Sequence, residues 1–140
     1  MNSKKIVTLM LEQGYVSTLL NKRLDGGLSV HGISTTEFVI MHKLASSATG
    51  NMSRIALADA VGLTASGVTR LLAPMEKNNI TEKLANPRDA RQSLVGLSDV
   101  GRTLYNDAYV TFVHSCTSAF SLLDESEIDM LLHLLNKIKC

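Results

Sequence analysis

The sequence predicts a mainly α-helical protein with one small β-hairpin. Apolar residues recur at helical spacing along most of the 140-residue chain, and only residues 81–97 contain strand-like segments. A hydrophobic share of 45% with 19% charged residues is typical of a folded domain, and the length fits one domain over residues 1–140. The chain has two cysteines and no apolar run long enough to cross a bilayer, so we expect a cytoplasmic protein without a membrane span.

Long helices are expected at both ends of the chain. The first covers about residues 3–25 and carries apolar side chains on two adjacent sides, which favours burial against two surfaces. The pair Gly26-Gly27 is expected to end it. Residues 98–140 are expected to form two more helices, the first capped by Ser98 and the second beginning at the sequence DESE, residues 124–127.

Three shorter helices are expected between these long ones. The sequence STTE, residues 34–37, is a capping box in which Ser34 and Glu37 satisfy free backbone amides at the start of the second helix. Residues 46–51 are expected to be a loop, after which Ser53 caps a short helix over residues 54–61.

The fourth helix begins after Gly62, which breaks the third, and Thr64 is expected to cap it. Asn79 suits a left-handed residue at its end. Pro74 lies inside this helix and removes one backbone hydrogen bond. Because the apolar spacing continues to Met75, the sequence predicts a helix that is kinked at the proline.

Residues 54–72 have the pattern of a helix-turn-helix. Ala58 is small enough for two helices to cross, Gly62 fits the turn, and Val68 anchors the second helix. The exposed face of that helix has small polar residues where Lys and Glu are usual. Such a face lets the backbone approach DNA, and its hydroxyls together with Arg70 can bind phosphates and base edges in the major groove.

A β-hairpin is expected directly after this motif. The segments TEKLA, residues 81–85, and LVGL, residues 94–97, are joined by the polar turn NPRDAR. Its tip carries Arg88 and Arg91, with Asp89 between them to hold a guanidinium. A helix-turn-helix followed by a basic hairpin is a winged helix, whose tip can enter the minor groove. The charge distribution agrees, since residues 53–91 contain six basic and four acidic residues, whereas residues 98–140 contain three basic and six acidic ones.

The sequence resembles the MarR family of winged-helix transcriptional regulators. The matching segments are LADAVGLTASGVTRLLAPMEKNNI, DAR and LVGLSDVGRTL, and the final LLDESEIDMLLHLL resembles a dimerisation helix of that family. The resemblance implies a winged helix-turn-helix lobe over about residues 34–98, with dimerisation helices at about 3–25 and 98–140. It also implies a homodimer that binds double-stranded DNA at a pseudo-palindromic operator, more typically as a repressor.

Matched residue by residue, the resemblance implies a set of DNA contacts. It places the recognition-helix contacts on Thr64, Ala65, Ser66, Gly67, Thr69 and Arg70, the contacts to the DNA backbone on Ser53 and Arg54, and the wing contacts on Arg88 and Arg91. Three departures from the family pattern matter. Lys83 stands where Arg is common, so we expect no bidentate contact from it. Asn86 stands where Asp is usual, and we expect a looser wing tip. Asn79 replaces a usual glycine, and because Asn tolerates the left-handed conformation we expect the cap to survive.

The resemblance further implies a pocket for a small aromatic or other small-molecule effector between the dimerisation helices and the DNA-binding lobe. Five residues are candidates for its lining: Met10, Tyr15, His42, Tyr109 and Phe112. The same residues also fit a plain hydrophobic core. We expect no cofactor and no catalytic site, because the chain lacks a phosphate-binding glycine loop and the common hydrolase motifs.

Three other functions are weighed against this one. A metal-responsive regulator would use His42, His114 and His31, but no ligand stands four residues from His114, so we expect no metal site. A thiol-responsive regulator would use Cys116 or Cys140, yet Cys116 lies on an apolar helix face, where cysteine is usually an inert small residue. A helical protein-interaction module would have no need of the basic hairpin or of the small-residue helix face.

Overall fold

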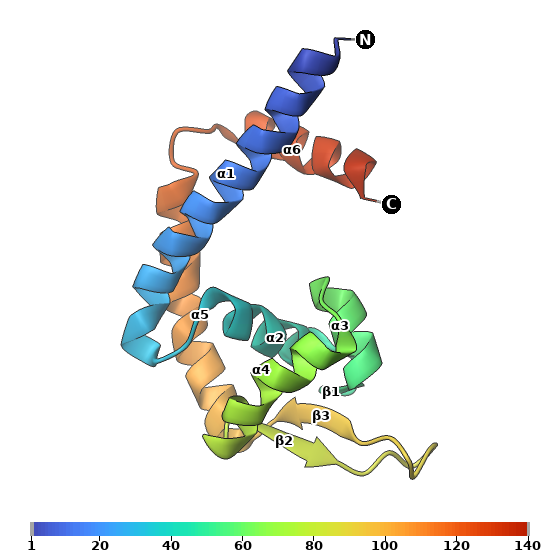
Figure 1. Cartoon of the computed structure of the whole chain (residues 1–140). Helices are drawn as coiled ribbons and strands as arrows, with labels where there is room; N and C mark the ends of the chain where they lie inside the picture. Colours follow the sequence, from blue (N-terminus) through green and yellow to red (C-terminus); the bar gives the residue numbers. More distant parts are fainter. Residues whose placement is uncertain (1, 140) are drawn as a thin grey trace.

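The computed structural model describes residues 2–139 and confirms a mainly helical fold with a small antiparallel sheet (Figure 1). In chain order the elements are α1 (Ser3–Leu28), the 3-10 turn η1 (Ser29–His31), α2 (Thr35–Ser46), β1 (Asn51–Ser53), α3 (Arg54–Val61), α4 (Ala65–Lys77), β2 (Thr81–Leu84), β3 (Leu94–Leu97), α5 (Asp99–Ala119) and α6 (Glu125–Ile138).

The molecule has a lobe made of α2, α3, α4 and the sheet, and long helices that extend from it (Figure 1). The hydrophobic core lies in the lobe, where several side chains are fully buried: Leu44, Leu57, Val68, Leu72 and Val95. Helix α5 leaves the lobe, packs against α1 and leads into α6. No residue of α6 is buried, so the chain by itself does not cover this helix.

Helix α1 is longer than the sequence predicts. Gly26 and Gly27 do not end it, and the helix continues to Leu28, which is almost completely buried. A Cβ on Gly27 would lie 2.6 Å from the Ser115 hydroxyl oxygen of α5. Gly27 therefore permits a close approach of two helices, and burial of Leu28 outweighs the weak helix propensity of the glycine pair.

The sheet has a third strand that the sequence did not indicate. Part of the expected loop, beginning at Asn51, forms β1 and pairs with β3 on the side opposite β2, in the order β1-β3-β2. A three-residue strand is too short to show an alternating pattern, and only its partner's free backbone groups make it a strand. The predicted hairpin of β2 and β3 is confirmed, with Thr81 opposite Leu97 and Leu84 opposite Leu94.

The predicted helix caps are confirmed. Both capping boxes are present, one with Ser34 and Glu37 and the other at residues 124–127, and Ser53, Thr64 and Ser98 accept amide hydrogen bonds at their helix starts. Asn79 adopts the left-handed conformation at a φ of 62°. Helix α4 runs through Pro74 to Lys77, so the proline does not end it. The predicted kink itself stays a prediction.

The junction between α4, the sheet and α5 is unusually close. The Ser98 backbone amide donates to the Ile80 carbonyl oxygen at 3.0 Å, and the Ser98 hydroxyl accepts from the Gly101 amide at 2.9 Å. Gly101 lies so near Ile80 that an added Cβ would overlap its carbonyl oxygen and carbon. The backbone at Ile80 cannot yield easily, because it also pairs with the end of α4.

We therefore expect Gly101→Ala to lower the free energy of unfolding by roughly 2–4 kcal/mol, as other overpacked sites do. Gly26→Ala is the matched control, since none of the described residues lies within 4 Å of a Cβ there. That variant should be neutral or up to about 1 kcal/mol more stable. Urea denaturation of both proteins measures the difference, and equal stability would contradict the close junction.

Candidate nucleic-acid interface

Helices α3 and α4 form the predicted helix-turn-helix. Gly62 ends α3 in the left-handed conformation at a φ of 72°, and its amide donates to carbonyl oxygens of the last turn. The two helices are bent by 104° relative to each other. Leu57 and Ala58 of α3 are buried with Val68 of α4, which confirms the predicted anchor. This angle and this small-residue crossing are typical of helices that place the second one in a DNA groove.

The lengths and compositions of the helices can be compared with the expectation that the chain has no membrane span. Within residues 2–139, no single helix is long and apolar enough to cross a membrane. Only α3 and α4 taken together reach that length and composition, and they are sharply bent at the turn between them.

The start of α4 faces solvent. Thr64, Ala65, Ser66, Thr69 and Arg70 are exposed, and Gly67 is half-buried. The Thr64 hydroxyl oxygen accepts from the Gly67 amide at 3.0 Å, so this side chain serves as the helix cap as well as a candidate DNA contact. Free amides of a first helical turn attract anions, and no acidic residue stands in this turn.

The wing, which we define as β2, β3 and residues 85–93 between them, carries its cations at the tip. Arg88 and Arg91 are exposed, with 96% of the Arg91 side chain accessible to solvent. Asn86 and Asp89 organise the tip, because their side-chain oxygens each accept a backbone amide two residues later at 3.0 Å. The Asn86 amide oxygen makes a bond that a carboxylate would also make, and the expected loosening of the tip stays a prediction. Asp89 also lies 3.8 Å from the Arg91 guanidinium, which confirms the predicted pairing.

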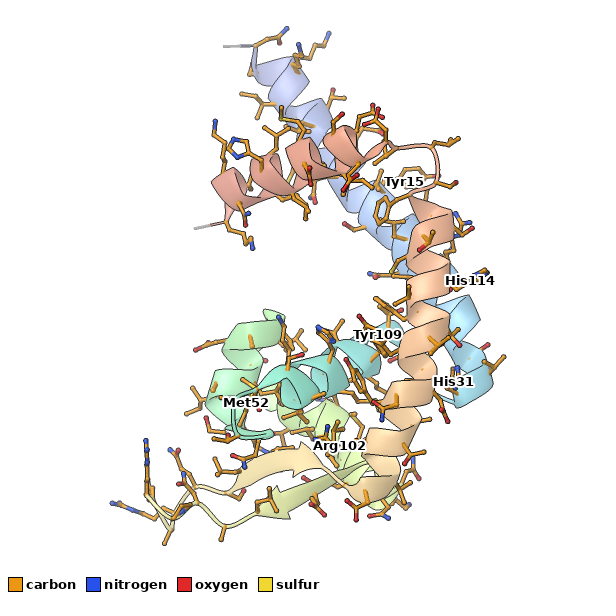
Figure 2. All side chains as sticks on the ribbon, turned by 180° about the vertical axis from the view of Figure 1, so that it is seen from behind. Tyr15, His31, Met52, Arg102, Tyr109 and His114 are labelled. Carbon is orange, nitrogen blue, oxygen red and sulfur yellow. The ribbon has the colours of Figure 1, made fainter. Side chains whose placement is uncertain are left out.

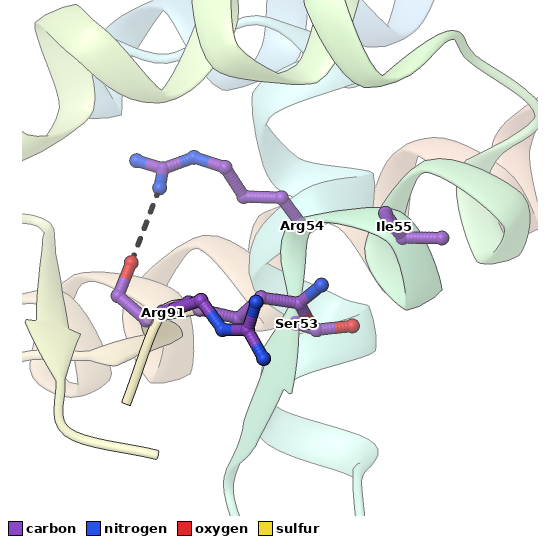
Figure 3. Close-up of a pocket in the computed structure, with 6 residues that line it drawn as sticks. Ser53, Arg54, Ile55 and Arg91 are labelled. Carbon is purple, nitrogen blue, oxygen red and sulfur yellow. Dashed lines mark hydrogen bonds between the residues drawn. The ribbon is translucent and has the colours of Figure 1, made fainter. Parts of the chain in front are cut away.

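Ser53 and Arg54 lie where α3 begins. The Ser53 hydroxyl caps the helix by accepting from the Ala56 amide at 3.1 Å. The Arg54 side chain is 25% exposed, and its guanidinium points toward α4 and the base of the wing (Figure 3). It pairs with Glu76 at 3.0 Å and donates to the Ser93 hydroxyl at 3.4 Å. The structure therefore places Arg54 in contact with the protein itself, a feature that the sequence did not indicate.

An aromatic cluster joins α2 to α5 beside a pocket of about 410 Å³. Three of the five predicted pocket residues, His42, Tyr109 and Phe112, line this pocket together. Phe38 stacks on Phe112 with ring centroids 4.3 Å apart, and the Tyr105 hydroxyl lies 2.7 Å from His42 Nδ1. Burial and then the neighbouring Tyr109 raise the pKa of Tyr105.

The sequence did not single out Phe38, which lines the pocket, or Tyr105, which belongs to the aromatic cluster beside it. Phe38 stands four residues before His42, and Tyr105 stands four residues before Tyr109. Side chains at that spacing share one face of a helix, so the signal was present in the sequence. What the sequence lacked was the pairing of the two helices, which brings the faces together.

Met10 and Tyr15 do not lie in this pocket. Both side chains are mostly exposed on α1, at 65% and 60%. Tyr15 lies near the C-terminal end of α5, whereas Tyr109 lies beside α2 (Figure 2). Because a helix rises about 1.5 Å per residue, Tyr15 stands roughly 20 Å along α1 from its buried end at Leu28. Met10 and Tyr15 are therefore absent from this cavity of the single chain, and their place in an effector pocket of a dimer stays a prediction.

The histidines and Cys116 are placed apart. His31 lies 2.8 Å from the Thr111 hydroxyl, whereas His42 shares its hydrogen bond with Tyr105. His114 is exposed on α5. Within the described part of the chain, no three His, Cys, Asp or Glu side chains are arranged to hold a metal ion.

Cys116 is half-buried, and burial raises the pKa of its thiol. This environment disfavours the reactive thiolate, in agreement with the expectation of an inert cysteine. The other cysteine, Cys140, lies outside the described residues.

Comparison with known proteins agrees with this geometry. Residues 33–93 match the model of the MarR family. This match spans the winged helix-turn-helix region, where the chain resembles the MarR family. The HTH-type transcriptional regulator MhqR of Bacillus subtilis (strain 168) is 22% identical over 130 residues, which cover 93% of this chain and 87% of that protein.

Two solved structures of this family share the fold over nearly the whole chain. A mutant MarR from E. coli complexed with operator DNA matches at a TM-score of 0.89 and 21% identity, covering 97% of this chain and 96% of the other. Sco3205 of Streptomyces coelicolor, in complex with DNA, matches at 0.88 and 21% identity, covering 99% and 87%. Both of those structures are complexes with DNA, and the chain shares their fold.

The cap of α4 can be tested separately from DNA. We expect Thr64→Ala to lower the free energy of unfolding by about 1 kcal/mol, because the Gly67 amide loses its acceptor. Thr69→Ala is the matched control on the same exposed face and should be neutral or a few tenths of a kcal/mol more stable. Chemical denaturation distinguishes the two, and equal effects would contradict a capping role.

Proposed function

We propose that this protein is a cytoplasmic homodimeric repressor of the MarR family that binds a pseudo-palindromic operator and is released by a small-molecule effector. The observation that supports it best is the conjunction of two surfaces in one lobe. The first turns of α4 are exposed and carry small side chains. The wing follows α4 in the chain, and its tip presents Arg88 and Arg91 to solvent. A helix for the major groove and cations for the minor groove together read DNA.

In this proposal the DNA contacts divide by type. The exposed start of α4, from Thr64 to Arg70, enters the major groove, where Arg70 reaches a guanine edge or a phosphate. The wing tip, with Arg88 and Arg91, follows the backbone into the minor groove. Ser53 lies at the start of α3, where its backbone contacts a phosphate. The contacts to phosphates supply most of the binding free energy and make it depend on salt, whereas the contacts to base edges supply a smaller, sequence-dependent share.

The exposed apolar faces of α1 and α6 support the homodimer. Eight large apolar side chains of α1 are at least 46% exposed: Ile6, Val7, Leu9, Met10, Leu11, Tyr15, Val16 and Leu19. Helix α6 has seven more large apolar side chains that are at least 37% exposed: Ile128, Met130, Leu131, Leu132, Leu134, Leu135 and Ile138. A patch of this extent is costly in water unless another surface covers it. A second copy would pair these faces and bring two recognition helices about one DNA turn apart.

The pocket beside the aromatic cluster supports the effector. Its volume of about 410 Å³ is that of a small-molecule site. The stacked rings of Phe38 and Phe112 offer apolar faces, and His42 supplies a polar edge next to Tyr105. This lining favours a small aromatic ligand. Because the pocket lies between α2 of the lobe and α5, a bound ligand would act on the angle between the DNA-binding lobe and the dimerisation helices.

The DNA contacts can be tested with duplex fragments that the protein selects from its own genome. Arg70→Ala should weaken binding to the selected fragment by roughly 1–3 kcal/mol and reduce the protein's preference for that fragment over unrelated DNA.

Arg88→Ala should weaken binding to all duplexes and reduce the slope of log K against log salt by about one per protomer. Fluorescence anisotropy measures both, with Lys22→Ala on the exposed part of α1 as the control cation. A wild-type protein that binds no duplex at low salt would refute the function.

The dimer has its own test in sedimentation equilibrium. The wild-type protein should sediment at about twice the chain mass of 15.2 kDa. Leu131→Asp places a charge in the exposed apolar face of α6 and should shift the protein toward the monomer. Ile55→Asp is the control, because Ile55 is 57% exposed on α3 in the lobe and should leave the mass unchanged. A monomeric wild-type protein would contradict the proposal.

A further inference from the structure

The Arg54 side chain connects three elements of the DNA-binding lobe. It stands at the first position of α3, and its Nη2 donates to Glu76 Oε1 in the last turn of α4 at 3.0 Å. Its Nη1 donates to the hydroxyl of Ser93, directly before β3, at 3.4 Å (Figure 3). Because the guanidinium is planar and rigid, it holds its two partners, Glu76 and Ser93, at a set distance from each other. The side chain thus relates the end of the recognition helix to the base of the wing.

Burial shows that this arginine faces inward. The Arg54 and Glu76 side chains are 25% and 26% exposed, whereas that of Arg91 in the wing is 96% exposed. Arg54 Nε is buried, and within the described residues it has no hydrogen-bond partner. A guanidinium that has lost much of its water is stabilised by its remaining partners, so withdrawing it toward a phosphate would leave Glu76 half-buried and unpaired.

The wing base has an open space beside this arginine. A pocket of about 250 Å³ lies between the start of α3 and the wing, with Ser53, Ile55, Arg91 and Gln92 in its lining (Figure 3). Apolar packing therefore does not fill the gap on this side. On this side, the hydrogen bond from Arg54 to Ser93 links the start of α3 to the residue directly before β3, and the bond to Glu76 fixes the same guanidinium to α4.

We propose that Arg54 and Glu76 position the wing for DNA rather than contact DNA themselves. This inference rests on the proposed function, because it assigns these residues a role in DNA affinity. It revises the expectation that Arg54 binds the DNA backbone. Loss of either residue frees the wing base from α4, so that Arg88 and Arg91 must be ordered at the moment of binding, at an entropic cost to affinity.

The effect of removing Glu76 on DNA affinity distinguishes a positioning role from simple electrostatics, because the two predict changes of opposite sign. Glu76 is an acid on the recognition helix of a DNA-binding lobe, and removing an acid from such a surface should strengthen binding to a polyanion. If Glu76 holds Arg54 in place, its removal should weaken binding instead. Glu82 is the matched control, because it is an exposed acid on β2 and, among residues 2–139, forms no ion pair.

The test measures anisotropy of the selected genomic duplex with Glu76→Ala, Arg54→Met, the double variant and Glu82→Ala. We expect Glu76→Ala to weaken binding roughly two- to tenfold, as loss of a partly buried ion pair does. Glu82→Ala should not weaken binding, and the double variant should be no weaker than Arg54→Met. Tighter binding by Glu76→Ala, or independent effects that multiply in the double variant, would overturn the proposal.

Two further variants separate positioning from phosphate contact. Arg54→Lys keeps the charge but cannot reach both partners, so it should lose as much affinity as Arg54→Met. The salt slope of Arg54→Met should equal that of the wild type. A lysine variant with wild-type affinity, or a slope reduced by about one per protomer, would show that Arg54 binds a phosphate and would overturn the proposal. Glu76→Gln, which preserves the shape of the side chain, repeats the test if Glu76→Ala does not fold.

Hydrogen exchange of the free protein provides a readout without DNA. Amides of the wing residues 85–93 should exchange faster in Arg54→Met and Glu76→Ala than in the wild type, and at the wild-type rate in Glu82→Ala. Unchanged exchange in the first two variants would overturn the positioning role even where DNA binds. If the wild type binds no duplex, the proposed function is refuted. The exchange rates then still decide whether Arg54 and Glu76 hold the wing in place.

Discussion

The contact between the start of α5 and the backbone at Ile80 determines how the two parts of the molecule are joined. The Ser98 amide bonds to the Ile80 carbonyl, and Gly101 has no side chain to keep the two backbones apart. Helix α5 can therefore begin directly against the end of α4 and the sheet. Because α5 packs on α1 and leads into α6, the direction of the long helices relative to the lobe follows from this one junction.

The two parts differ in how their apolar surface is covered. In the lobe, the core closes around Leu57, Val68 and Val95 within one chain, so the helix-turn-helix has a fixed shape. In α1 and α6, the apolar faces remain exposed, because no other part of the described chain covers them. The aromatic cluster of α2 and α5 lies where these parts meet. In the proposed function, a ligand there would contact the lobe on one side and helix α5 on the other, and could thereby couple its own binding to that of DNA.

Local signals were predicted well because their physics is local. A cap such as Ser34 or Thr64 bonds to an amide three residues away, and Gly62 and Asn79 adopt left-handed conformations that depend on the residue itself. Features that depend on distant partners were missed. The strand β1 exists only because β3 offers a free edge. The reach of α1 past Gly27 depends on its approach to Ser115 of α5, 88 residues later in the chain.

The sequence by itself determined the class of the fold, the positions of most helix ends, the winged helix-turn-helix and the family resemblance. Only the tertiary structure decided which side chains of the candidate sites meet. It brought His42 to Tyr105 and Tyr109, separated Met10 and Tyr15 from them, and turned Arg54 toward Glu76 and Ser93. The physical reason is that a sequence pattern specifies which face of a helix is apolar or charged, whereas the partner of that face depends on how whole elements pack.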